Sequence, residues 1–135
     1  MKKNKFIAQA DDADFEAKIK DLLLYRKIVE VSEITWEEEQ QGILLLDNGV
    51  KLIVYGNEGC GGCGNGWYYL KNLQGCDNAI TDVKCVINYE SNNYGDDVYQ
   101  IFIFAEDKEI ECVRYEGYDN GYYGTGFNLY VEVDV

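Results

Sequence analysis

The residues whose types and spacing could do chemistry gather in two segments, 56–69 and 114–127. The second begins with Arg114 and Tyr115 and continues through Asn120, Gly121, Tyr122 and Tyr123. A guanidinium group pairs with phosphate oxygens, and aromatic rings stack on a nucleobase. The combination predicts a binding site for a planar ligand that carries phosphate. Asn-Gly is equally typical of a plain turn, in which the tyrosines would only pack at the rim.

Arginine is scarce in this chain, which has only Arg26 and Arg114. We therefore count Arg26 together with Arg114 among the candidate ligand-binding residues.

The first segment holds six glycines and two cysteines within residues 56–67. Such a run costs conformational entropy, and it is expected where the backbone turns tightly or approaches a partner closely. The alternative interpretation of this segment is a long turn, because glycine often only marks a loop. Cys60 and Cys63 could form half of a zinc site, completed by Cys76, Cys85 or Cys112. Because no second Cys-x-x-Cys and no histidine pair accompany them, reduced structural thiols are favoured and no cofactor is expected.

The composition disfavours several classes of function. Histidine is absent, which removes the usual general base and the commonest metal ligand. Acidic neighbours such as Asp96 and Asp97 are typical of a solvated face in so acidic a chain. The sequence therefore predicts a protein that is not an enzyme. The formal charge of −13 disfavours binding to DNA, RNA or an anionic membrane.

The length of 135 residues suits one domain. Five cysteines without an apolar leader favour reduced thiols and a cytoplasmic location, and no window reaches the apolar length of a membrane-spanning helix. We expect residues 1–10 to be flexible and residues 27–135 to form a β-rich body.

The hydrophobic spacing predicts one helix, over 12–25, with acidic residues at its start. Asn48-Gly49 between two β-rich runs predicts a tight hairpin. Strands are predicted over 27–35, 43–46, 50–55, 67–70, 79–89, 98–105, 109–115 and 127–133. The expected class is α+β: a curved, mainly antiparallel sheet or half-barrel of about seven strands with an N-terminal helix.

Four stretches resemble a family of small bacteriophage and prophage proteins described as a domain of unknown function. The resemblance spans roughly residue 27 to the C-terminus and leaves the helix outside. The stretches are Gly56–Cys63, Gly66–Leu70, Asp77–Thr81 and Asp119–Phe127.

The size, the N-terminal helix, the curved sheet and the segment Arg-x-x-Gly-x-x-Asn-Gly-Tyr-Tyr are also similar to the phage Thoeris anti-defence sponges. That resemblance implies a non-catalytic protein that sequesters nucleotide immune signals, such as cyclic ADP-ribose isomers made by bacterial TIR enzymes. Some members of that family also hold cyclic oligonucleotides at separate sites in a hexamer. It implies ligand-binding roles for Arg114 and the tyrosines, whereas the thiol-rich loop has no assigned role there.

Three hypotheses follow from the sequence. The first is a viral nucleotide-signal sponge in the host cytoplasm, working as a homo-oligomer, either a dimer or a hexamer. The second is an acidic protein-interaction module that inhibits a host protein through a face including Glu37 to Glu39. The third is a zinc-stapled structural domain.

Overall fold

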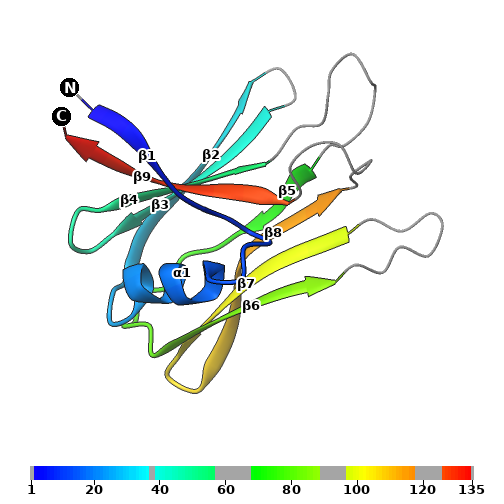
Figure 1. The fold of residues 1–135 in the computed structure, drawn as a ribbon. Coiled ribbons are helices and arrows are strands. Elements are labelled where there is room, and N and C mark those ends of the chain that lie inside the picture. Colours follow the sequence, from blue (N-terminus) through cyan, green and yellow to red (C-terminus); the bar gives the residue numbers. More distant parts are fainter. Residues whose placement is uncertain (1, 37–38, 57–67, 89–96, 118–125, 135) are drawn as a thin grey trace, which may run out of the picture.

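The computed structural model describes residues 2–36, 39–56, 68–88, 97–117 and 126–134, and these form nine strands and one helix (Figure 1). The elements are β1 (Lys2–Gln9), α1 (Phe15–Leu23), β2 (Ile28–Trp36), β3 (Glu39–Leu46), β4 (Lys51–Gly56), β5 (Tyr68–Leu73), β6 (Asp82–Asn88), β7 (Asp97–Ala105), β8 (Lys108–Gly117) and β9 (Phe127–Asp134). No described helix has the length and apolar character needed to cross a bilayer.

The strands form two antiparallel sheets. One has five strands in the order β1-β9-β4-β3-β2, and the other has four in the order β5-β8-β7-β6. The predicted mainly antiparallel fold with one N-terminal helix is confirmed, with nine described strands in place of about seven. The sheets do not close into a barrel. They approach each other where Ile28, at the start of β2, pairs with Cys76 just after β5.

The β3–β4 hairpin forms as the sequence predicts. Gly49 adopts a φ of 86°, which suits a residue without a Cβ, and the Val50 N–H donates to Asn48 Oδ1 over 3.1 Å. β2 and β3 also pair in antiparallel fashion, from Ile28 opposite Leu46 to Trp36 opposite Glu39.

The N-terminus forms a strand within residues 1–10, the stretch that the sequence predicts to be flexible. Residues 2–9 form β1, which pairs along β9 from Lys2 opposite Asp134 to Gln9 opposite Asn128. The strand is a basic edge strand, and the Lys2 ammonium lies 3.4 Å from the Glu132 carboxylate. A run of lysines has little strand propensity, so the backbone partner at the far end of the chain is what orders it.

The helix is shorter than predicted and closes the side of the fold between β1 and β6. α1 contacts both strands and buries Phe15, Ile19 and Leu23 in the core between the sheets (Figure 1). Its Glu16 carboxylate accepts the Cys85 N–H over 2.9 Å, which satisfies a donor of β6, the edge strand of its sheet.

Candidate ligand-binding site

The two segments singled out in the sequence are anchored at neighbouring strand ends. Gly56, the last residue of β4, pairs with Phe127, the first of β9. Gly117, the last residue of β8, pairs with both Tyr68 at the start of β5 and Asp97 at the start of β7. Segments 57–67 and 118–125 therefore leave and re-enter the described part of the chain at the same end of the two sheets.

A buried aromatic cluster lies directly beneath these strand ends. The Tyr115 ring stacks on Phe127 with centroids 4.9 Å apart, and Tyr99 meets both Phe127 and Tyr68 edge to face. Phe15 of α1 also meets Phe127 edge to face, with ring centroids 5.6 Å apart. All five side chains belong to the core, so this end of the fold has a rigid base.

Tyr115 is part of this core and does not lie on a surface that a ligand can reach. Its side chain is fully buried, and its hydroxyl donates to the Val54 carbonyl over 3.0 Å. Burial raises the pKa of Tyr115 well above its ordinary value. The sequence assigned Tyr115 to the ligand, and the structure gives it a supporting position instead.

Tyr115→Phe tests this assignment. We expect the variant to lose about 1–1.5 kcal/mol of unfolding free energy, because it deletes the buried hydrogen bond to the Val54 carbonyl and keeps the ring. Urea unfolding followed by circular dichroism measures the change. A stability equal to that of the wild type would contradict the role of the hydroxyl in the core.

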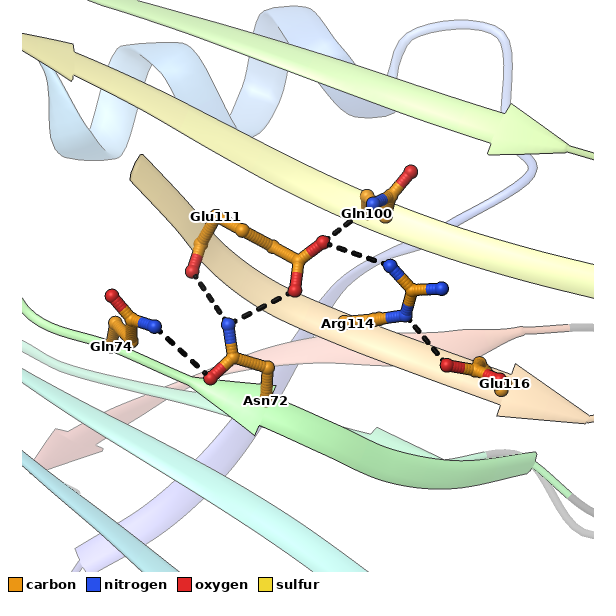
Figure 2. Close-up of polar contacts among 6 residues, drawn as sticks. All are labelled: Asn72, Gln74, Gln100, Glu111, Arg114 and Glu116. Carbon is orange, nitrogen blue, oxygen red and sulfur yellow. Dashed lines mark hydrogen bonds and ion pairs between the residues drawn. The ribbon is translucent and has the colours of Figure 1, made fainter. Parts of the chain in front are cut away.

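Arg114 lies on the opposite face of the four-stranded sheet, away from the core. Its neighbours Val113 and Tyr115 point inward, and successive strand residues alternate between faces. Arg114 Nε donates to Glu116 Oε2 over 2.6 Å, and Nη1 donates to Glu111 Oε2 over 3.2 Å (Figure 2). The two carboxylates hold the guanidinium in one orientation while about a third of the arginine side chain, 35%, stays exposed.

Glu111 is the centre of the network in Figure 2. Asn72 of β5 donates to its Oε1 over 3.0 Å and to its backbone carbonyl over 3.2 Å. Gln100 of β7 donates to its Oε2 over 2.5 Å, and Gln74 supports Asn72 from the other side at 3.3 Å. The polar network therefore ties β5, β8 and β7 together across the outer face.

A β-bulge places Glu111 beside Arg114. Ile101 pairs with Val113 and Phe102 pairs with Glu111, so Cys112 is an extra residue in β8. Without it, two residues three apart in a strand would point to opposite faces. The sequence prediction missed Glu111 for this reason, and it missed Asn72 and Gln100 because they reach Arg114 only through the pairing of β5 and β7 with β8. Glu116, two residues after Arg114, could have been found from strand alternation.

The network carries one net negative charge, from two glutamates and one arginine. Burial by itself would raise the pKa of Glu111, but hydrogen bonds from Gln100, Asn72 and Arg114 outweigh it and hold that pKa below its usual range. The hydrogen bond to Glu116 raises the pKa of Arg114. Glu111 and Arg114 are therefore both ionised at neutral pH.

Glu111→Gln tests the network through pH. Because the folded-state pKa of Glu111 is depressed, its ionised form adds stability above the ordinary value of 4.5, and this stability is lost as the pH falls through the folded-state pKa. We expect the variant to unfold at lower urea than the wild type at neutral pH, with the difference shrinking below about pH 4.5. A difference that is constant with pH would contradict the assignment.

Arg26 lies apart from this site. Its guanidinium Nη1 is 3.7 Å from Asp47 Oδ1, in the turn that joins β3 to β4. That turn is at the opposite end of β4 from Gly56, so the two arginines are not brought together. Arg26 serves a local ion pair at the far end of the sheet.

The other predicted site residues, Asn120, Gly121, Tyr122 and Tyr123, lie outside the described residues, as do Cys60 and Cys63. Within the described ranges there is no group of three side chains suited to a metal ion. Burial raises the pKa of Cys85 and of Cys112 to about 12, so both are protonated thiols at neutral pH. The zinc hypothesis for Cys60 and Cys63 stays a prediction.

Comparison with known families gives a match to most of the chain. The model of a family described as a domain of unknown function, DUF7448, matches residues 21–129. The chain belongs to this family. The match runs from the end of α1 to the start of β9, and therefore includes Arg114, its polar neighbours and both glycine-rich segments. No curated protein matches the chain, and no solved structure matches it. Membership in a family of unknown function is confirmed, and the phage and Thoeris identities stay predictions.

Proposed function

We propose that this DUF7448 protein binds and sequesters a nucleotide-derived signal without turning it over. The observation that carries the proposal is the partly exposed Arg114 side chain, whose guanidinium is held in one orientation by Glu111 and Glu116 on a platform of three strands. Gly117, three residues after Arg114, is the last residue of β8. The segment that follows it in the sequence holds Asn120, Tyr122 and Tyr123. Three strand residues span roughly 10 Å, the scale of one nucleotide.

The glutamates narrow the class of ligand. An arginine with two carboxylate partners is a poor site for inorganic phosphate, because the local net charge is negative. The same carboxylates are good acceptors for the hydroxyls of a ribose, as in dinucleotide-binding folds. The combination suits a molecule with both phosphate and free ribose hydroxyls, which a cyclic ADP-ribose isomer has.

The ionisation of the described groups supports binding rather than catalysis. A general acid or base works best with a pKa near the operating pH. The shifted pKa values near the site move away from neutrality: that of Glu111 is lowered, and those of Tyr115 and Cys112 are raised. These side chains therefore keep one protonation state at neutral pH, which suits a binding site better than proton transfer.

The biological setting of the proposal rests on the resemblance to phage anti-defence sponges. A phage protein that removes a TIR-derived signal needs tight binding and no chemistry, which fits a site built from a fixed arginine and hydrogen-bond acceptors. The segment from Arg114 to Tyr123 carries the resemblance, and it starts at the platform described above.

Isothermal titration calorimetry tests the proposal. Purified full-length protein is titrated with cyclic ADP-ribose isomers, cyclic dinucleotides and, as a control for simple anion binding, inorganic phosphate. We expect saturable binding of at least one nucleotide and none of phosphate. Failure to bind any of the nucleotides would overturn the proposal and favour the protein-interaction hypothesis.

A further inference from the structure

The five-stranded sheet has an apolar row on the face turned away from the core. Leu52 and Val54 of β4 belong to the core cluster, and Ile53 between them points to the other side. The register sets Ile53 opposite Ile43 on β3 and Tyr130 on β9. Ile53 is buried, with only 5% of its surface exposed, although it is not part of the core cluster.

The row continues to both edges of the sheet. Tyr130 pairs with Phe6 on β1, and the two rings meet edge to face at 5.7 Å. Ile43 pairs with Ser32 on β2, and Ile34 stands two residues further along the same face. Phe6 is 52% exposed and Ile34 is 47% exposed, so the most open apolar side chains lie at the two edges.

Among the described elements, none packs on this face. The core-facing side holds α1, through Phe15, and β5, through the contact of Leu73 with Gly42 (Figure 1). None of the described helices and strands therefore covers the outer side of β1-β9-β4-β3-β2.

We propose that this face binds the same face of a second copy, about a two-fold axis that runs along β4. Such an axis reverses the strand order, so β1 lies over β2 of the partner subunit and Ile53 lies near the axis. Phe6 then covers Ser32 and Ile34 of the partner subunit, and the same contact occurs a second time. A two-fold interface needs this kind of self-complementary patch.

Charged side chains lie at both edges of this face. Lys2 lies four residues before Phe6 in β1, so it is on the same outer face. Glu30 pairs with Leu45 and lies on the outer face of β2. Lys2 already lies 3.4 Å from Glu132 and 4.0 Å from Asp134 of its own chain, and reversed strand order brings Glu30 of the partner subunit to the same edge.

The size of the face suits a stable dimer. Five strands about 4.8 Å apart and roughly 25 Å long give a plan area on the order of 600 Å². Side-chain relief raises the accessible area above this figure, toward the ~800 Å² per partner of an ordinary specific interface. The face belongs to the five-stranded sheet and Arg114 to the four-stranded sheet. The test of dimer formation and the test of ligand binding can therefore fail independently of each other.

Light scattering coupled to size exclusion tests the interface on the full-length chain. We expect the wild type to have twice the monomer mass of 15.5 kDa. Phe6→Asp and Ile34→Asp should each weaken the dimer roughly 100-fold, because each carboxylate enters the apolar interface twice. Both side chains are about half exposed in the monomer, so circular dichroism should show folded variants.

Tyr25→Asp is the matched control. Tyr25 is 69% exposed, lies outside both sheets, and has a φ of 66°, which aspartate tolerates. It adds the same negative charge and should leave the dimer intact. A wild type that stays monomeric at about 100 µM, or a dimer unaffected by Phe6→Asp, would overturn the proposal.

Discussion

Replacing Gly56 with alanine is expected to destabilise the protein by about 3 kcal/mol or more. A Cβ at this position would lie 2.5 Å from the Tyr68 carbonyl oxygen and 2.9 Å from the Tyr115 ring. The first contact is with backbone, so relief requires β4 and β5 to move apart, which disturbs the aromatic cluster beneath both glycine-rich segments. Urea unfolding followed by circular dichroism measures the loss.

Gly49→Ala is the comparison for this prediction. Gly49 has a φ of 86°, but no atom lies within 4 Å of the position that a Cβ would take, so the substitution tests backbone strain without a clash. We expect it to cost about 1 kcal/mol. If Gly56→Ala lowered the free energy of unfolding no more than Gly49→Ala, the result would contradict the close approach of β4 and β5.

Replacing Arg114 with alanine is expected to weaken nucleotide binding at least about 100-fold. The variant loses the charged hydrogen bonds to phosphate, and it leaves Glu111 and Glu116 without their cation, so the site then repels an anion. Arg114→Lys should recover only part of the affinity, because an ammonium lacks the planar set of donors that the two glutamates orient. Calorimetric titration of the three proteins with the nucleotide that binds best gives the ratios.

Arg26→Ala is the control for Arg114→Ala, since it removes the only other arginine and the same amount of charge. Its ion pair with Asp47 lies at the far end of β4, and its affinity for the nucleotide should equal that of the wild type. Equal losses in both variants would mean that general charge, and not the platform around Arg114, holds the ligand.

Local patterns predicted the strands that turn signals mark out. Asn48-Gly49 predicted the β3–β4 hairpin because positive φ angles are a property of the turn residues themselves. β1 could not be predicted in the same way, because its lysines form a strand only through pairing with β9 at the other end of the chain.

The candidate site was only partly predictable. Arg114 and Tyr115 were assigned together, although neighbours in a strand point to opposite faces, and the predicted strand over 109–115 already implied that separation. Glu111 could not have been placed beside Arg114, because the bulge at Cys112 depends on pairing with β7. The contribution of Asn72 likewise depends on β5 lying next to β8.

The most direct test of sequestration without turnover is the recovery of the ligand. The protein is incubated with an excess of the nucleotide that binds, separated from free nucleotide and denatured by heat, and the released molecules are identified by mass spectrometry. We predict about one molecule per binding site, with a mass identical to the input, from the wild type and none from Arg114→Ala. Release of a molecule of altered mass, or equal retention by Arg114→Ala, would contradict the proposed function.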